Sequence, residues 1–230
     1  MSSDASATTP DRTLRFVALG DSYTIGTALP EAADRWPNRL VAALDAARDR
    51  SHGAAPEIAL GAGLAPATLE LVANLAVEGF TSRNVIDVEL PDLPAVQPSF
   101  ASLLVGVNDV VQGVPAATYR ANAARILDVL LGRLPPNRIV TVGTPDYTVT
   151  PRGASYGDPT TQSAWIRTNN AILGELAAER RVAFVDIFDL SLRAAGDRTL
   201  VAGDDLHPSG AQYALWVERI GPVVARLLAS

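Results

Sequence analysis

Ser22 and His207 are the residues of this chain best suited to chemistry, and they lie near opposite ends of the sequence. Ser22 stands in GDSYTIG and His207 in DDLHPSG, three residues after Asp204. A serine hydroxyl is a weak nucleophile at neutral pH unless an adjacent base removes its proton. A histidine base needs a carboxylate that fixes its orientation and tautomer. Asp204, His207 and Ser22 would together supply the orienter, base and nucleophile of acyl-transfer chemistry.

The sequence around His207 indicates that its ring sits on a fixed corner. Pro208 favours an extended conformation for the residue before it, and Ser209 with Gln212 forms a potential capping box at the start of the last helix. Asp205 is the alternative orienter. The other histidine, His52, is expected at the C-terminal end of a helix, where a cation suits the dipole, and no chemistry is assigned to it.

The stabilisation of an oxyanion requires hydrogen-bond donors beside the nucleophile. The backbone N–H of Ser22 is one candidate. Gly79, in ANLAVEGFTS, can bring its backbone close to a substrate without a side chain in the way. Asn108, in VGVND, could donate from its side-chain amide at the end of a central strand. Taken singly, Gly79 is most often a turn glycine and Asn108 a strand-end cap.

Composition excludes several other kinds of chemistry. The 230 residues contain no cysteine, and all 19 basic residues are arginine. Disulfides, thiolate metal sites, lysine-dependent phosphate loops and Schiff bases are therefore excluded. The net charge of −6 and the scattered arginines argue against nucleic acid binding. No apolar stretch is long enough to span a bilayer. We expect no cofactor and no metal, and composition leaves the oligomeric state open.

The domain organisation follows from length and from the polar N-terminus. A chain of 230 residues suits one well-buried core. The start, MSSDASATTPDR, lacks the basic and apolar regions of a signal peptide. We therefore expect a disordered tail over 1–12, a single domain over 13–230 and a cytoplasmic protein. A secreted protein from which a signal peptide had been removed would begin with the same kind of polar segment.

Short β-rich runs alternate with longer amphipathic segments, which is typical of a parallel sheet covered by helices. We predict an α/β fold of three layers with about five parallel strands. Strands are expected at 14–20, 69–74, 100–109, 138–143 and 182–188. Helices are expected at 34–50, 82–90, 119–134 and 162–180, and over the C-terminal segment that contains 215–227. Pro91, Pro94 and Pro98 should break the chain after the second of these helices. Residues 53–67 remain unassigned, since their GAG matches a dinucleotide fingerprint only weakly.

Four sequence blocks together resemble the SGNH, or GDSL-type, hydrolase superfamily. They are GDSYTIG, the glycine of NLAVEG, GVND and DDLH, in the order of that family and over nearly the whole chain. The resemblance implies a flavodoxin-like three-layer sandwich and an ester hydrolase. It implies Ser22 as nucleophile, His207 as base and Asp204 as orienter. It also implies an oxyanion hole formed by Ser22, Gly79 and Asn108.

The substrate is expected to be a small ester, with a short acyl or acetyl group. Tyr23, Ile25, Val107 and Tyr147 could line an acyl pocket, and the long loop over 144–161 could form one of its walls. Thioesters, lysophospholipids and acetylated sugars stay open as substrates. Two other functions also stay open. One is a noncatalytic carbohydrate or lipid binder of the same fold, and the other is a flavin or nucleotide binder that uses GDSYTIG for phosphate.

Overall fold

The structure is a computed structural model that describes residues 12–52 and 67–229. The expected N-terminal tail, up to residue 11, and most of the unassigned segment, 53–66, lie outside the described residues. Within the described part, one sheet of five parallel strands has the order β2-β1-β3-β4-β5. The strands are β1 (Arg12–Gly20), β2 (Ala67–Asn74), β3 (Phe100–Leu104), β4 (Ile139–Val142) and β5 (Ala183–Val185).

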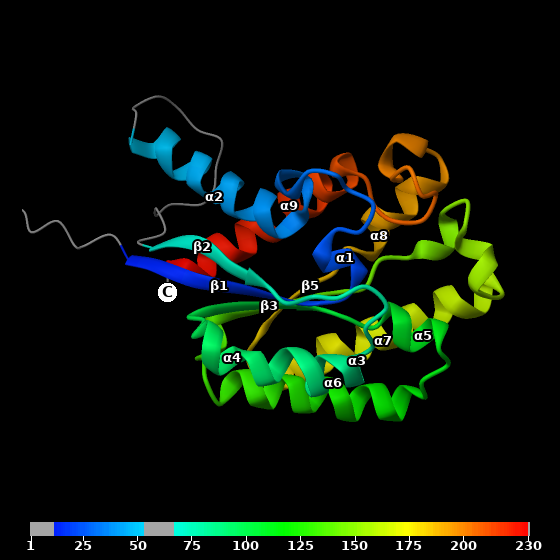
Figure 1. The fold of residues 1–230 in the computed structure, drawn as a ribbon, viewed down its shortest axis with the longest axis horizontal. Helices are drawn as coiled ribbons and strands as arrows, with labels where there is room; N and C mark the ends of the chain where they lie inside the picture. The colour runs from blue at the N-terminus through cyan, green and yellow to red at the C-terminus, as the bar shows by residue number, and fades with distance from the viewer. Residues whose placement is uncertain (1–11, 53–66, 230) are drawn as a thin grey trace, which may run out of the picture.

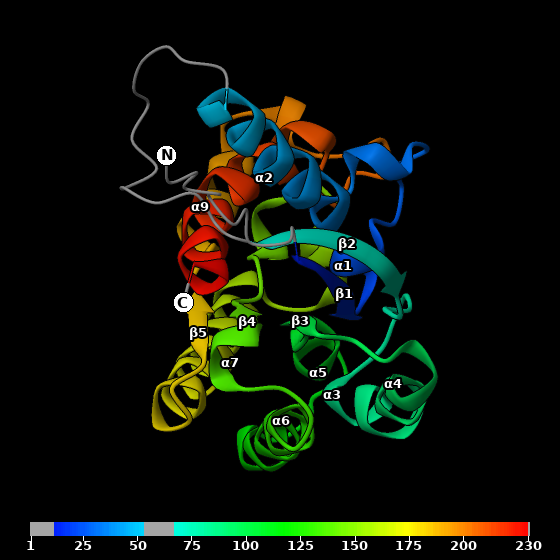
Figure 2. The same ribbon diagram turned by 90° about the vertical axis from the view of Figure 1, so that its left-hand side faces the viewer.

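Helices cover both faces of this sheet (Figure 1), so the predicted three-layer α/β fold is confirmed. The helices are α1 (Ser22–Ile25), α2 (Trp36–His52), α3 (Ser82–Asn84), α4 (Leu90–Val96), α5 (Val107–Val111), α6 (Ala116–Leu131), α7 (Pro159–Glu179), α8 (Phe188–Ser191) and α9 (Gly210–Leu228). Seen along the sheet in Figure 2, α2 and α9 lie on one side, and α4, α6 and α7 lie on the other. None of the helices in the described ranges is long and apolar enough to cross a membrane.

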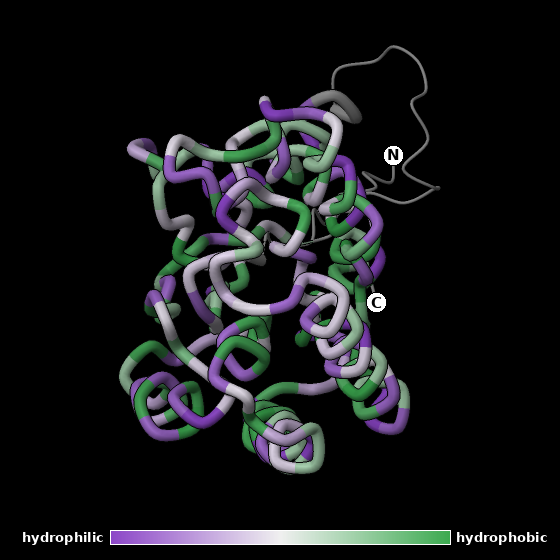
Figure 3. Tube along the Cα trace, turned by 90° about the vertical axis from the view of Figure 1, so that its right-hand side faces the viewer, coloured by the Kyte–Doolittle hydropathy of each residue, from purple (hydrophilic) through white to green (hydrophobic). Residues whose placement is uncertain are grey.

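Amphipathic helices explain how two hydrophobic cores form around one sheet. In α2, Trp36 and Leu40 are fully buried, and in α9 Trp216, Ile220 and Val224 are fully buried against the same face. These residues recur at the spacing of a helical stripe, as burial on one side requires. Figure 3 shows hydrophobic and hydrophilic residues alternating along the helices that surround the sheet. The residues of α6 and α7 build the second core on the opposite face.

The expected break at the prolines after residue 90 is wrong at two of the three positions. Helical backbone runs from α3 through a π-helical turn, Val85–Glu89, and through α4 as far as Val96. Pro91 falls in the first turn of α4, where a missing N–H costs little. Pro94 lies inside α4 without ending it. The chain leaves the helix only at Gln97, one residue before Pro98.

The strand order identifies where a ligand would bind. In an order of 2-1-3-4-5, chain connections leave β1 and β3 toward opposite faces of the sheet, which opens a crevice at the carboxyl ends of these strands. Ser22 lies two residues after the end of β1, and Asn108 lies four residues after the end of β3. Gly79 lies beyond the end of β2, which pairs with β1 on its other side. Three of the candidate residues thus meet at the switch point of the sheet.

Candidate active site

The nucleophile candidate, Ser22, occupies the first position of the short helix α1. Asp21 caps this helix, because its Oδ1 accepts a hydrogen bond of 3.0 Å from the backbone N–H of Tyr23. The carbonyl of Ser22 accepts hydrogen bonds from the N–H groups of Gly26 and Thr27, at 3.0 and 3.1 Å. A tight turn thus holds the Ser22 backbone on both sides. The Ser22 side chain is largely buried yet faces a pocket.

His207 and Asp204 form the hydrogen-bonded pair that the sequence suggested. The Nδ1 of His207 lies 2.5 Å from Oδ2 of Asp204. The other carboxylate oxygen, Oδ1, accepts the backbone N–H groups of Leu206 and His207, at 3.1 and 3.0 Å. Burial would raise the pKa of Asp204, but the hydrogen bonds from the ring and from these N–H groups outweigh it and hold this pKa below the usual value. An ionised carboxylate only accepts hydrogen bonds, so Nδ1 carries the proton and Nε2 is left free as a base.

The alternative orienter, Asp205, points elsewhere. Its carboxylate forms an ion pair with Arg198, at 2.8 Å, and its backbone adopts a positive φ of 65°. Ser209 caps the helix that follows, with its Oγ accepting the N–H of Gln212. Ser209 thus caps α9 as the sequence predicted, but its own N–H bonds to the carbonyl of Leu200 at 2.9 Å and not to the side chain of Gln212, so the capping box is only half formed.

Ser22 and His207 line one pocket of about 220 Å³. Most of the residues singled out in the sequence lie on its wall, and so do several aliphatic and aromatic side chains. The candidates on the wall are Ser22, Tyr23, Gly79, Val107, Asn108, Tyr147 and His207. The sequence did not point to Val111, Tyr156 and Leu206, which also line the pocket.

Ile25 does not lie on this wall, although the sequence suggested it. Ile25 lines a neighbouring cavity instead. The physical reason is the helical geometry of α1, because a residue three positions after Ser22 stands one turn further along the axis. In an extended segment, side chains alternate between two faces, so Ser22 and Ile25 would point to opposite sides.

The three residues that the sequence suggested for an oxyanion hole, Ser22, Gly79 and Asn108, all line the pocket. The backbone N–H groups of Ser22 and Gly79 have no hydrogen-bond acceptor among the described residues. Gly79 has a φ of +80°, a conformation that favours glycine, and a Cβ there would meet no atom within 4 Å. The Nδ2 of Asn108 donates one hydrogen bond, of 2.9 Å, to the carbonyl of Phe80. The second hydrogen of that amide stays available for a ligand.

A buried carboxylate that the sequence did not single out supports this donor set. Asp109 is fully buried, and it accepts hydrogen bonds from the Ser82 N–H at 2.8 Å and from the Ser82 hydroxyl at 2.5 Å. Asn122 donates a further bond of 3.0 Å to that hydroxyl. These contacts tie the loop after β2, which carries Gly79, to the helix that carries Asn108. The only signal in the sequence was the position of Asp109 next to Asn108.

Two further buried acids, Glu89 and Asp21, accept hydrogen bonds from the backbone on either side of Ser22. Glu89 is 1% exposed, and its Oε2 accepts the N–H of Gly20 at 2.9 Å. Burial raises the pKa of Glu89 to about 9; the bond from Gly20 opposes this rise, and the charge of Asp21 adds to it. Burial also raises the pKa of Asp21 to about 8. The backbone on either side of Ser22 is therefore anchored by carboxyl groups that prefer the neutral form at pH 7.

Tyr23 connects the helix that carries Ser22 to His207. Its ring packs against the imidazole of His207 with 5.4 Å between centroids, and against Trp216 of α9. The hydroxyl of Tyr213, also in α9, donates a buried hydrogen bond of 2.9 Å to the carbonyl of Tyr23. The last helix of the chain thereby holds the first short helix in place beside His207.

The loop over 144–161 contributes an aromatic wall. The rings of Tyr147 and Tyr156 pack edge to face with 5.8 Å between centroids, and both line the pocket. Arg152, between them, donates its backbone N–H to the carbonyl of Asp205 at 3.0 Å. This loop is therefore attached to the loop that carries His207, and it forms the side of the pocket that the sequence suggested.

Comparison with known families identifies the class to which this fold and site belong. The sequence matches the GDSL-like Lipase/Acylhydrolase family over residues 18–215, which includes all four sequence blocks. The chain therefore belongs to this family of acyl hydrolases, and the resemblance seen in the sequence is confirmed. It is accordingly a hydrolase of carboxylic esters. No curated protein matches the chain in sequence.

Solved structures of low sequence identity share the fold. A variant of Axe2, an acetyl xylan esterase from Geobacillus stearothermophilus, has a TM-score of 0.65 at 17% identity, with 93% of this chain and 95% of that chain covered. The lipase/acylhydrolase from Enterococcus faecalis has a TM-score of 0.63 at 20% identity, with 94% and 96% covered. The psychrotrophic esterase EstA from Pseudoalteromonas sp. has a TM-score of 0.63 at 16% identity, with 96% and 100% covered. At these identities the comparison establishes the common fold.

Proposed function

We propose that this protein hydrolyses short acyl or acetyl esters through an acyl-enzyme on Ser22. The Nε2 of His207 takes the proton of the Ser22 hydroxyl while the oxygen attacks the ester carbonyl carbon. The tetrahedral intermediate then expels the alcohol, which leaves with the proton held by His207. Water attacks the acyl-enzyme with the same base, and the acid product is released together with free Ser22.

The observation that carries this proposal is the pairing of Asp204 with His207 on the wall of the pocket that also contains Ser22. The carboxylate fixes the tautomer in which Nε2 is unprotonated, and it stabilises the imidazolium that forms during attack. Packing of the ring against Tyr23 limits the orientations that the imidazole can adopt. These are the requirements for a general base beside a serine.

The proposed oxyanion hole consists of the N–H groups of Ser22 and Gly79 and the side-chain amide of Asn108. All three residues line the pocket, and the described residues offer no acceptor for the two N–H groups. Donors that are already in place need no reorganisation when negative charge develops on the carbonyl oxygen. The bond from Asn108 to Phe80 keeps the amide in a fixed position.

The size and lining of the pocket support a small acyl group. Its volume of about 220 Å³ lies below the usual range of roughly 300–1,000 Å³ for small-molecule sites. Its wall is mostly aliphatic and aromatic, with Val107, Tyr147 and Tyr156 among the lining residues. One structural neighbour is an acetyl xylan esterase, which agrees with an acetyl or similarly short acyl group. Long acyl chains would extend beyond this pocket.

A fluorophosphonate probe and an ester series test this proposal together. The probe should label the wild type and should not label Ser22→Ala. A series of p-nitrophenyl esters from acetate to palmitate should give the highest kcat/KM at the short end, with acetylated sugars, a thioester and a lysophospholipid assayed beside it. A wild type that is neither labelled nor active on any of these substrates would instead be a noncatalytic binder of the same fold.

The two histidines give a matched control for the base. His207→Gln should reduce kcat by at least about a thousandfold, because the serine then lacks its base. His52→Gln should leave activity unchanged, since His52 is the last residue of α2 and no role is assigned to it. The reverse pattern, with activity lost only in the His52 variant, would refute the assignment.

A further inference from the structure

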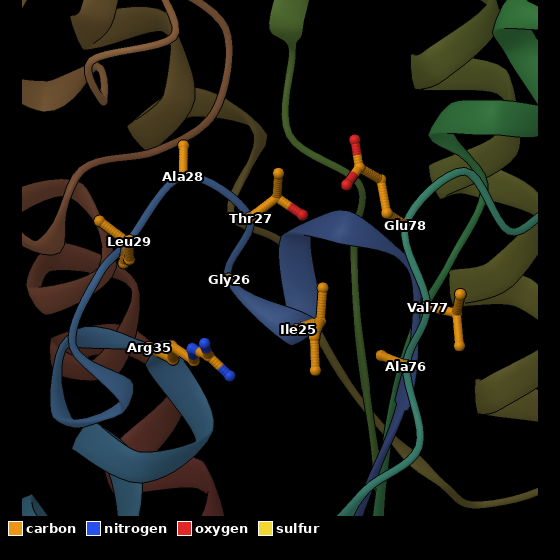
Figure 4. A pocket seen from close by; sticks show the side chains of 9 residues that line it. All are labelled: Ile25, Gly26, Thr27, Ala28, Leu29, Arg35, Ala76, Val77 and Glu78. Carbon is orange, nitrogen blue, oxygen red and sulfur yellow. The ribbon is translucent and has the colours of Figure 1, made fainter.

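A cavity of about 390 Å³ adjoins the active-site pocket. Figure 4 shows it between the turn that follows α1, with the start of α2, on one side and the segment after β2 on the other. Glu78 lines both the cavity and the active-site pocket, so the two spaces meet at this residue. The cavity is not part of the proposed catalytic apparatus, and neither the sequence blocks nor the family assignment gives it a role.

The cavity begins one helical turn from the nucleophile. Ile25 and Gly26, at the end of α1, line it, and the N–H of Gly26 bonds to the carbonyl of Ser22 at 3.0 Å. One turn of helix advances about 5 Å along the axis. A substrate whose ester group lies at Ser22 can therefore extend into this cavity on one side of the scissile bond.

Arg35 places an unneutralised positive charge in the cavity. Its side chain lies on the cavity wall opposite Ala76 and Val77 (Figure 4). Within residues 12–52 and 67–229, its guanidinium has no ion pair and no hydrogen bond, and its Nε is buried without an acceptor. The neighbouring acid, Asp34, does not serve Arg35, because it pairs with Arg39. A buried donor of this kind is stabilised when a ligand supplies the acceptor.

Contact with the backbone keeps the Arg35 side chain in position. A Cβ on Gly26 would lie 2.5 Å from Cγ and 2.9 Å from Cδ of Arg35, so the arginine stem lies directly across the glycine. Gly26, the second glycine of GDSYTIG, thus leaves room for the Arg35 side chain and also forms the turn after α1. This contact involves only the aliphatic part of the side chain, which leaves the guanidinium free to bind.

We propose that this cavity is a subsite for a carboxylate group on the ester substrate, with Arg35 as the residue that binds it. A planar guanidinium matches a carboxylate through two parallel hydrogen bonds. A single cation with Glu78 at the opposite rim suits a monoanion, whereas a phosphate dianion would call for several donors. The cavity walls formed by Ile25, Leu29 and Val77 suit the short aliphatic spacer between the ester and the carboxylate. This inference rests on the proposed function, because it describes the part of the substrate beyond the bond that is cut.

Binding to Ser22→Ala tests the subsite separately from catalysis, since this variant binds esters without turnover. Two matched pairs of esters test whether the carboxylate lies on the acyl side or on the alcohol side of the ester bond. Monomethyl adipate against methyl hexanoate tests the acyl side, and 4-acetoxybutanoate against butyl acetate tests the alcohol side. Calorimetric titration should show the carboxylated member of at least one pair binding about tenfold more tightly or better. Raised salt should reduce this preference.

Three substitutions in the Ser22→Ala background assign the preference to Arg35. Arg35→Gln keeps Cβ, Cγ and Cδ, and with them the contact with Gly26, and it should abolish the preference. Arg35→Lys should retain a preference of several-fold. Arg133→Gln removes the same charge at an exposed site two residues after the end of α6, in the segment that leads to the amino end of β4, and it should change nothing. Glu78→Gln should increase the affinity for the carboxylated ester about two- to threefold.

The outcomes of these experiments separate the carboxylate subsite from the proposed ester hydrolysis. Equal affinity of Ser22→Ala for both members of each pair, no detectable binding of the carboxylated esters, or an unchanged preference in Arg35→Gln would each overturn the subsite. If Arg35→Gln does not fold, Arg35→Lys decides. A preference that stays unchanged in Arg35→Lys would overturn the subsite, because loss of the planar guanidinium must weaken a two-bond contact with the carboxylate. A wild type that binds the carboxylated esters through Arg35 but hydrolyses no ester would refute the proposed function and leave the subsite standing.

Discussion

The buried carboxyl group of Glu89 should make the stability of this protein fall as the pH rises. Glu89 is 1% exposed, accepts one hydrogen bond from Gly20, and has a second oxygen, Oε1, with no partner. Its pKa is raised to about 9, whereas a glutamate in an unfolded chain titrates near pH 4.3. Between these values the folded protein keeps the proton and the unfolded chain has lost it. Unfolding then releases a proton, so a rise in pH favours unfolding.

The size of this pH effect on stability follows from the release of one proton per molecule on unfolding. Below pH 4 both states are protonated and the contribution of Glu89 is fully present. Across the window up to about pH 9, each pH unit removes about 1.4 kcal/mol from the free energy of unfolding. Glu89→Gln keeps an oxygen that can accept the Gly20 N–H, and it cannot ionise. From about pH 5.5 to about pH 7.5, the variant should therefore gain about 2.7 kcal/mol relative to the wild type.

Urea unfolding followed by tryptophan fluorescence at several pH values measures this difference. Asp21, whose pKa is also raised, is present in both proteins, so its own titration contributes to both pH profiles. Glu218→Gln is the matched control, because Glu218 is exposed on α9 and its replacement should not change the pH dependence. Free energies of unfolding for the wild type and Glu89→Gln that run parallel across the whole range would show that Glu89 is ionised in the folded protein, and the reasoning would fail.

Three further substitutions, one of them with a control, test the geometry around Ser22. Asn108→Ala should lower kcat by roughly a hundred- to a thousandfold with little change in the folded state, as measured by ester hydrolysis and circular dichroism. Asp204→Asn should lower kcat by about a thousandfold or more while Asp205→Asn stays near the wild type, and equal losses would contradict the assignment of Asp204 as orienter. Tyr213→Phe leaves the carbonyl of Tyr23 without its buried donor and should reduce the free energy of unfolding by about 1–3 kcal/mol in urea titrations.

Local patterns in the sequence predicted most of the fold. Each strand begins and ends within a few residues of its expected bounds, apart from the C-terminal ends of the two runs expected at 100–109 and 182–188. In the first of these, Gly106 starts a short helix, α5, and Asn108 lies on that helix instead of at the end of a strand. The apolar residues before Gly106 gave a clear strand signal. The change to helix after it depends on a backbone with φ of 141°, which the residue types do not specify.

The parts of the site that the sequence did not predict depend on contacts between distant segments. Glu89 resembles an ordinary surface glutamate, because glutamate is rarely buried without a partner. Its partner, Gly20, is 69 residues away in the chain. Asp109 and Ser82 are 27 residues apart, and neither belongs to a pattern of regular spacing. The Asp204–His207 pair could be predicted because both members lie on one loop, three residues apart.

The difference between contacts within one loop and contacts between distant segments also explains how the two ends of the chain form one site. Ser22 belongs to α1 and His207 to the loop before α9, so their alignment depends on how α9 packs against α1. Two contacts fix that packing, namely the hydrogen bond from Tyr213 to Tyr23 across 190 residues and the ring of Tyr23 between His207 and Trp216. A shift of α9 would move His207 relative to Ser22 and leave the pocket wall from the loop after β2 in place. Substitutions in the core of α9 should therefore lower kcat more than they raise KM.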